Sequence, residues 1–547
     1  MGELLDAPAE AAGGLAVYGA GAVDAAAPAS TRQALVDGGV PGRLAAGDPA
    51  CWGRSATAGL GWLAAHRHGR ELLPQLAELT AELADLDHVV LAGTAGASLA
   101  AEAVARTTGR PLTVLDTTDP GRVRATLADR LTRTVVVLAG DAGVEIDSFR
   151  RAYWQAFLDA GLTEAEAGRH FVVVTEPGSP LAAVAAELDA ITVPAEEQVT
   201  DGYRALTAYG LVPCALAGAA VADLLDQAEE FAASLGRSAE NPALALGAAL
   251  AAAATTGRDK VALVADGSGI EGLGEWVAQL LAGTARDGLG ILPVVVESPT
   301  AAGVTGTDVL TVSYGGALTA GAVPAAGRAA DLAVNGPLGA HLLAWQYATA
   351  VAATVLGVDP FDRPDAGSGE HVPAVLTDED IPAMLAQPLA PSTVAAAIEV
   401  YAPPGAPAGL ADALRHLVHG MDPDGYLAVV AYLDAYADAD AARLRPLLAE
   451  VTGRPVTFGW APRHPHAIGQ YHIHGPQVGS FVHLTGTVDV DLPVPGRPYS
   501  FGELQAAQAA SDRRALAGRG RPLLHLHLTD RTAGLAQLLD TVGSLRA

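Results

Sequence analysis

The chain has 547 residues, which at ordinary domain sizes corresponds to about three or four domains. Half of the residues are hydrophobic, so each domain can bury a core, and the formal net charge of −28 excludes nucleic acid and anionic membrane surfaces as expected partners. The two cysteines, Cys51 and Cys214, provide no disulfide framework and favour a reducing cytoplasm. No apolar run reaches the roughly 18 residues of a membrane span, so we expect none.

Residues 1–55 are rich in Ala, Gly and Pro, and we expect them to form an N-terminal arm that wraps the first domain, with a short helix near Thr31–Val36. Short apolar runs then alternate with helical stretches over residues 56–198, the predicted first domain. The runs predicted as buried strands are His88–Ala92, Pro111–Leu115, Thr134–Leu138 and Phe171–Val174. Repeated strand–helix units favour a doubly wound parallel sheet in an α/β fold.

A second alternating set occupies residues 199–375, with predicted strands at Val261–Ala265, Ile291–Val296 and Val309–Val312 and a long helix at about Leu338–Leu356. Pro, Gly and Asp without periodic apolar residues predict a linker at 376–394. A third alternating set, residues 395–547, is expected to form a C-terminal α/β domain. Its predicted strands are Ala396–Val400, Tyr426–Val430, Val456–Phe458, Phe481–Thr485 and Pro522–Leu528.

Several segments resemble the actinobacterial type of glucose-6-phosphate isomerase, the type also found fused behind transaldolase. They include Leu115-Asp-Thr-Thr-Asp-Pro120, Val173–Leu181, Ala205–Leu211, Gly257–Leu263 and Gly520–Asp530. The resemblance implies two sugar-isomerase domains that share one active site, often in a dimer. It also implies ring opening and proton transfer through an enediol, with a glutamate base, a histidine, an arginine, a lysine and two phosphate-binding loops.

The family's phosphate-binding loops are altered in this chain. The first corresponds to Gly93-Thr94-Ala95-Gly96-Ala97-Ser98, from which we predict Gly93, Thr94, Gly96 and Ser98 as ligand-binding residues. The second corresponds to Leu138–Gly143, which has no hydroxyl and no lysine and carries Asp141 where a phosphate should lie. Two like charges about 4 Å apart in a partly dry pocket repel by several kcal/mol, so Asp141 argues against a phosphorylated ligand.

The family's acid–base residues are also replaced. The arginine corresponds to Gly202, with Arg204 two positions later; the glutamate base falls near Gly283, and the catalytic lysine falls on Glu370. Lys260 is the only lysine in the chain, so little lysine chemistry is available.

A partial set of the family's polar residues remains. Glu145 and Ser98 are retained, as is His466 with Gln470 behind it. We therefore predict His466, Glu145, Glu370 and Asp141 as the catalytic group, and we add Arg204 and Gln470 to the ligand-binding group.

Two further patterns suggest cofactors but have simpler interpretations. Gly267–Gly272 follows a strand and opens a helix, as in a dinucleotide site, but it also matches a family loop and is interpreted as a tight turn. His464, His466, His472 and His474 lie within eleven residues and could bind a divalent metal. We favour polar histidines at a domain interface and predict neither metal nor cofactor.

Three functions are compatible with these residues. The first is a non-catalytic or weakly catalytic homologue that binds a sugar-like ligand, or that pairs with itself or with an active isomerase. The second is an enzyme with altered chemistry, in a specialised biosynthetic pathway, on an unphosphorylated or cationic substrate attracted to Asp141 and Glu370, with His466 as the acid–base group. The third is an active glucose-6-phosphate isomerase. Loss of phosphosugar isomerase activity is the prediction we prefer.

Overall fold

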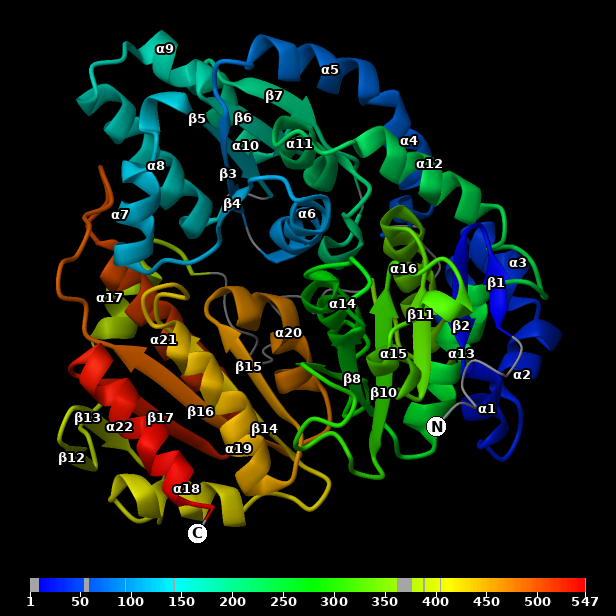
Figure 1. Cartoon of the computed structure of the whole chain (residues 1–547). Helices are drawn as coiled ribbons and strands as arrows, with labels where there is room; N and C mark the ends of the chain where they lie inside the picture. Colours follow the sequence, from blue (N-terminus) through cyan, green and yellow to red (C-terminus); the bar gives the residue numbers. More distant parts are fainter. Residues whose placement is uncertain are drawn as a thin grey trace.

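The computed structural model describes residues 9–53, 59–93, 95–140, 143–197, 199–361, 376–386, 389–403 and 405–546. The chain folds into three predominantly parallel sheets covered by helices, in agreement with the predicted α/β class (Figure 1). Within these ranges, no helix combines the length and the apolar character needed to cross a membrane.

The first sheet has the order β4-β3-β5-β6-β7, and all its neighbouring strands are parallel. Its strands are β3 (His88–Gly93), β4 (Thr113–Leu115), β5 (Thr134–Ala139), β6 (Phe171–Thr175) and β7 (Ile191–Pro194). Every residue of β3, β5 and β6 is buried, because helices cover both faces, and this explains why continuous apolar runs predicted these strands correctly.

The second sheet has the order β1-β2-β11-β10-β8-β9. Its strands are β1 (Glu10–Ala12), β2 (Leu15–Tyr18), β8 (Lys260–Ala265), β9 (Leu292–Val296), β10 (Val309–Gly315) and β11 (Leu332–Asn335). The prediction that the N-terminal arm wraps the first domain is wrong, because β2 pairs antiparallel with β11. This pairing covers an otherwise open sheet edge and buries Leu15 and Val17. The predicted helix near Thr31–Val36 is α2 (Thr31–Asp37).

The third sheet has the order β12-β13-β17-β16-β14-β15. Its strands are β12 (Thr393–Ala395), β13 (Ile398–Tyr401), β14 (Tyr426–Tyr432), β15 (Val456–Trp460), β16 (Gly479–Gly486) and β17 (Leu523–Leu528). The predicted strand Ala396–Val400 is half of a hairpin, whose turn contains Ala396 with φ of 50°. The predicted linker contains α17 (Asp380–Leu385), which buries Ile381.

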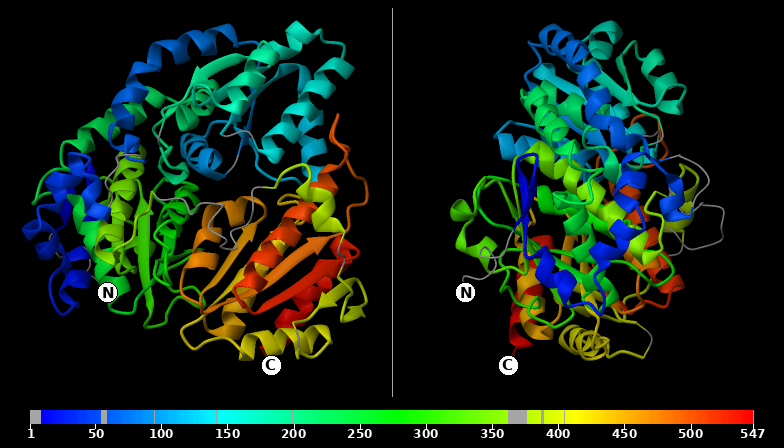
Figure 2. Two further views of the ribbon diagram at one scale, coloured as in Figure 1. Left: turned by 180° about the vertical axis from the view of Figure 1, so that it is seen from behind. Right: turned by 90° about the vertical axis from the view of Figure 1, so that its right-hand side faces the viewer.

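The helices that position the site come from all three sheet units. They are α6 (Ala95–Thr108) and α8 (Val144–Asp159) of the first unit, α14 (Leu273–Ala282) and α16 (Leu338–Leu356) of the second, and α20 (Arg463–His474) and α21 (Phe501–Gly518) of the third. Three of them, α6, α14 and α20, contact one another. Figure 2 shows the three sheet units around this common centre.

The remaining helices mostly cover the sheets or the molecule's outer surface. They are α1 (Ala20–Ala25), α3 (Val40–Ala45), α4 (Ala65–Glu71), α5 (Leu73–Glu82), α7 (Pro120–Ala128), α9 (Glu164–Arg169), α10 (Pro180–Glu187), α11 (Ala208–Leu216), α12 (Val221–Ala232), α13 (Pro242–Thr255), α15 (Ala325–Arg328), α18 (Leu410–His419), α19 (Leu444–Thr452) and α22 (Arg531–Ser544). Gly247 lets α13 approach α16 closely, because a Cβ atom there would lie 2.5 Å from the carbonyl oxygen of Ala348.

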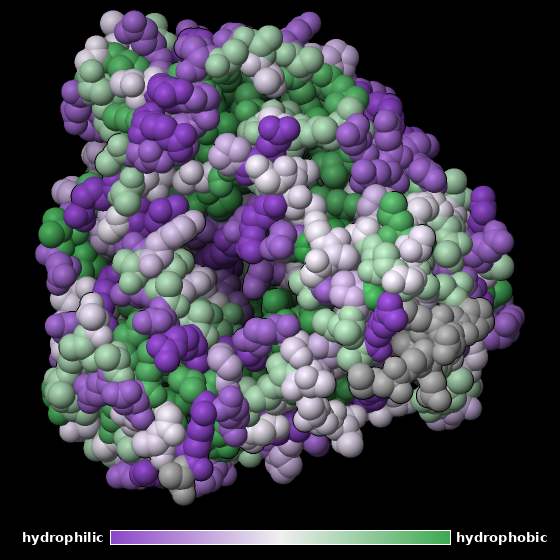
Figure 3. All heavy atoms as spheres, in the orientation of Figure 1, coloured by the Kyte–Doolittle hydropathy of each residue, from purple (hydrophilic) through white to green (hydrophobic). Residues whose placement is uncertain are grey.

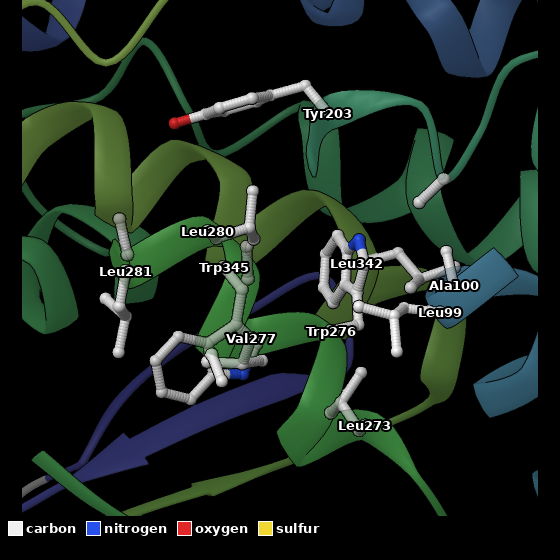
Figure 4. Packing of buried hydrophobic residues seen from close by; sticks show 14 of the residues in the cluster. Leu99, Ala100, Tyr203, Leu273, Trp276, Val277, Leu280, Leu281, Leu342 and Trp345 are labelled. Carbon is white, nitrogen blue, oxygen red and sulfur yellow. The ribbon is translucent and has the colours of Figure 1, made fainter. Parts of the chain in front are cut away.

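The first and second units share one hydrophobic core, and α14 lies within it. Figure 4 shows Trp276 and Leu280 of α14 beside Leu99 of α6 and Trp345 of α16. The indole nitrogen of Trp276 donates a hydrogen bond of 3.0 Å to the carbonyl oxygen of Gly202. This buried contact fixes α14 and hence its neighbouring residue Glu275, which lies on the exposed side of the helix.

Candidate functional site

The candidate site lies where α6, α8, α14, α20 and α21 meet. Figure 3 shows a hollow at the centre of this face of the molecule, with hydrophilic residues gathered around it. The polar side chains described below come from all three sheet units, so residues that are far apart in the chain meet here. The site therefore depends on how the three sheet units pack together.

His466 and Glu145 form the central pair of the site. Nε2 of His466, on α20, lies 2.8 Å from Oε1 of Glu145, in the first turn of α8. The same Glu145 oxygen accepts a hydrogen bond of 2.6 Å from Gln508 of α21, whose own side-chain oxygen accepts one of 2.6 Å from the hydroxyl of Thr118. The His466 side chain is 40% exposed and that of Glu145 is 13% exposed, so a ligand can reach the imidazole while the carboxylate is held in place.

The protonation state of His466 follows from this pairing. Burial alone would lower its pKa, but the charge and hydrogen bond of Glu145, together with the charges of Asp512 and Asp116, raise it to about 9. At neutral pH the imidazole is therefore protonated. It can donate a proton to a bound ligand as a general acid, whereas the unprotonated base form is scarce.

A second group of polar residues surrounds Arg463, the first residue of α20. Arg463 forms an ion pair with Glu102 of α6, and its Nη1 lies 3.5 Å from Oδ2 of Asp116, directly after β4. That same Asp116 oxygen accepts a hydrogen bond of 2.8 Å from the buried hydroxyl of Ser98. Burial raises the pKa of Asp116, although the charge of Arg463 opposes this effect.

Two more carboxyl groups complete the site. Glu275 is accessible to solvent, but the surrounding protein partly desolvates its carboxyl group and so raises its pKa, while the charge of Arg463 opposes this and that of Glu102 adds to it. Burial also raises the pKa of Asp512, on α21, to about 6, and Asp512 accepts a hydrogen bond from Tyr432. The five carboxyl groups of the site contact or face two cations, Arg463 and His466. The five are Glu102, Asp116, Glu145, Glu275 and Asp512.

The first predicted ligand loop is enclosed by acidic side chains. Gly93 is the last residue of β3, and Gly96 lies in the first turn of α6. A Cβ atom at Gly96 would lie 2.5 Å from Cβ of Asp201, so the Asp201 side chain packs directly on this glycine. The Ser98 hydroxyl is committed to Asp116, as described above. Thr94 lies outside the described residues, and the ligand-binding roles of this loop remain predictions.

Two predicted catalytic residues, Asp141 and Glu370, also lie outside the described residues. The structure therefore brings together the other two, His466 and Glu145. Gln470 is on α20, where its side-chain nitrogen donates a hydrogen bond of 3.3 Å to the carbonyl oxygen of Ala285.

Arg204 is occupied by contacts within the protein. Its side chain is 4% exposed, and its guanidinium carbon lies 4.2 Å from the centroid of the Tyr209 ring. Its Nε donates a hydrogen bond to the carbonyl oxygen of Val199, and its Nη1 lies 2.9 Å from Oδ1 of Asp201. The predicted role in ligand binding is therefore poorly supported, because little of the guanidinium is open to a ligand.

The four clustered histidines have different surroundings. His466 pairs with Glu145, whereas His464 and His472 are buried with ring centroids 5.8 Å apart. Nδ1 of His472 lies 2.8 Å from the hydroxyl oxygen of Tyr426, which makes it a packing residue. Among the described residues, no group of three or more His, Cys, Asp or Glu side chains is arranged to hold a metal ion.

Several site residues were not predicted from the sequence. Asp116 directly follows a strand, a position where ligands commonly bind in parallel sheets. Gln508 and Asp512 are four residues apart on one helix and therefore share a face, which was an available signal. Arg463 and Glu275 gave no local signal, because their proximity depends on packing between distant segments.

No family model matches the chain. Two curated relatives are probable glucose-6-phosphate isomerases. The protein from Haloarcula marismortui is 33% identical over 225 residues, which cover 40% of this chain and 51% of the relative. The protein from Natronomonas pharaonis is 31% identical over 217 residues, which cover 38% of this chain and 50% of the relative. The chain thus spans about half the length of the curated relatives it matches.

Solved structures superpose loosely on the chain. A glucose-6-phosphate isomerase from Chlamydia trachomatis has 16% identity and a TM-score of 0.45, and the match covers 54% of this chain and 71% of the Chlamydia chain. A hypothetical protein from Thermus thermophilus has 16% identity and a TM-score of 0.41, and the match covers 94% of this chain and 89% of the Thermus chain. By sequence, the chain is similar to the two probable glucose-6-phosphate isomerases named above, over about half of their length.

Proposed function

We propose that the central site binds a neutral or cationic sugar-like ligand and that the chain has lost aldose–ketose isomerase activity on sugar phosphates. The observation that carries this proposal is the excess of carboxyl groups: five of them face Arg463 and His466. Arg463 is already paired with Glu102 and Asp116, so its charge is largely compensated before any ligand arrives.

Electrostatics argues against a phosphorylated ligand. A phosphate monoester carries nearly two negative charges at neutral pH, and each unit charge about 4 Å from a carboxylate is repelled by roughly 4 kcal/mol at an effective dielectric constant near 20. The N-terminus of α6 would otherwise favour an anion, but Asp201 packs against its Gly96. A hydroxyl-rich or amino-bearing ligand gains hydrogen bonds from the same carboxylates.

A second candidate function is acid–base catalysis on such an unphosphorylated ligand. It is favoured by the His466–Glu145 pair, in which a reachable imidazolium is held by a carboxylate that Gln508 orients. His466 would protonate an oxygen or nitrogen of the substrate, and Glu145 would stabilise the charge on the imidazole in its protonated form.

The direct test is conversion of fructose 6-phosphate to glucose 6-phosphate by the purified chain, followed by chromatography of both sugars. We expect no conversion above the rate of a Glu145→Gln variant. Conversion that is rapid in the wild type and lost in the variant would support the third candidate, an active isomerase, and would contradict the proposal.

A further inference from the structure

A second cavity, separate from the central site, lies in the third sheet unit. Its volume is about 420 Å³, which is within the range of small-molecule sites. It lies at the carboxyl ends of β14, β16 and β17, to which Tyr432, Thr485 and His527 belong. This is the edge of a parallel sheet at which ligands commonly bind.

Helix α21 separates this cavity from the central site. Gln505, Ala509 and Arg513 are spaced by four residues, so they share one face of α21, and all three line the cavity. Gln508 and Asp512, on the neighbouring face, belong to the central site. The two sites therefore lie on either side of one helix.

Arg513 is the feature that selects a ligand. Among the described residues it forms no hydrogen bond or ion pair, although neighbouring Arg514 donates to Met384. A guanidinium has five N–H donors, and since none of the Arg513 nitrogens is among the buried atoms that lack a partner, they are open to solvent and to a ligand in the cavity. Burial is also the main cause that lowers the pKa of Arg513.

The acidic residues of the cavity wall already have partners. Asp491 accepts hydrogen bonds from the backbone nitrogens of Leu492 and Gly502, and Glu503 accepts one from the backbone nitrogen of Ser500. Most of these bonds hold the two carboxylates at the start of α21, and among the described residues neither forms an ion pair with Arg513.

The opposite wall presents neutral hydrogen-bonding groups. The hydroxyl of Thr485 lies 2.9 Å from Nε2 of His525 and 2.8 Å from Nδ1 of His527. Burial, together with the charge of Arg513, lowers the pKa of His525 to about 2, so this ring is neutral at physiological pH. The amide nitrogen of Gln505, whose residue is 4% exposed, has no hydrogen-bond partner within the part of the chain that the structure describes.

We infer that this cavity binds a small molecule that carries a carboxylate or phosphate group paired with Arg513. The rest of the ligand lies against the apolar part of the wall, formed by Leu385, Val488, Ala506 and Ala509. The inference does not depend on the proposed function, because Arg513 and the four apolar residues are not part of the central site.

The test uses calorimetric titration of the full chain with benzoate and phenyl phosphate, and with benzyl alcohol as the uncharged control. We expect saturable binding of at least one of the two anions, with benzyl alcohol at least tenfold weaker, which is about 1.4 kcal/mol. The stronger anion identifies the oxyanion that the cavity prefers.

Variants place the binding in the cavity. Arg513→Gln should weaken anion binding at least tenfold, whereas Arg514→Gln, a matched change one residue along the chain, should leave it unchanged. Ala506→Leu fills the cavity from its exposed side and should weaken binding without touching the charge, which gives a second test should Arg513→Gln unfold the chain.

The inference is overturned if neither anion binds at concentrations up to about 10 mM, or if Arg513→Gln and Ala506→Leu both bind as tightly as the wild type. Glu145→Gln separates this result from the proposed function, because it alters the central site and should leave anion binding unchanged.

Discussion

His466 and Glu145 are 321 positions apart in the chain, yet Nε2 of one lies 2.8 Å from Oε1 of the other. This contact joins α20 of the third sheet unit to α8 of the first. The contact raises the pKa of His466, so that the imidazole stays protonated at neutral pH. The protonation state of the site therefore depends on how the two units pack together.

Replacing Glu145 by Gln should lower the pKa of His466 from about 9 toward the unperturbed value near 6.5. The reason is that the amide keeps a hydrogen-bonding group but removes the charge. The measurement is an NMR titration of the imidazole resonances. Asp147→Asn is the control, because Asp147 lies in the same turn of α8 but pairs with Arg150, Arg151 and Arg497. A wild-type His466 that titrates near pH 6.5 would contradict this prediction.

The same pair should make stability depend on pH. The folded state binds the His466 proton more tightly than the unfolded chain does, so the pair stabilises the fold fully below pH 6.5. This contribution is lost as the pH rises through about 9. In urea unfolding at pH 6, 8 and 10, the free energy of unfolding should decline with rising pH, and it should decline less in Glu145→Gln than in the wild type. Equal declines in the two proteins would argue against the pairing.

The sheets could be predicted from sequence because parallel strands buried on both faces are continuous apolar runs, as in Thr134–Ala139. The position of Leu15–Tyr18 could not, since a four-residue strand at a sheet edge carries no sign of its partner. Likewise, His466 and Glu145 could be predicted from family motifs. Their neighbours Glu275 and Arg463 could not, because only the packing of the three units brings them together.

Trp276 should be a large contributor to stability. It is fully buried and donates to Gly202, so Trp276→Ala should lower the free energy of unfolding by about 3–5 kcal/mol, and Trp276→Phe by about 1–3 kcal/mol. Urea denaturation followed by circular dichroism measures both losses. The matched control is Trp460→Phe, at a partly exposed site on β15, which should cost less than half as much as Trp276→Phe. Equal losses at the two tryptophans would contradict the packing described.

Lys260, the only lysine of the chain, should be structural rather than catalytic. Its side chain is 3% exposed and pairs with Asp259 at 2.7 Å and Asp308 at 3.0 Å, and Asp308 also pairs with Arg454 of the third unit. Lys260→Met should lower the free energy of unfolding by about 2 kcal/mol, because Asp308 keeps one cationic partner and loses the other. Lys260→Arg keeps the charge and should cost less. A methionine variant as stable as the wild type would show that the ion pairs of Lys260 make no net contribution to the free energy of unfolding.

The preference of the central site for ligand charge is the most direct test of this account. Calorimetric titrations of the chain with glucosamine, glucose and glucose 6-phosphate should be compared at one pH and ionic strength, in the wild type and in Glu102→Gln. We predict that glucosamine binds more tightly than glucose, that glucose 6-phosphate binds most weakly, and that the variant narrows these differences. Tightest binding of glucose 6-phosphate by the wild type would contradict the claim that this site rejects a phosphate.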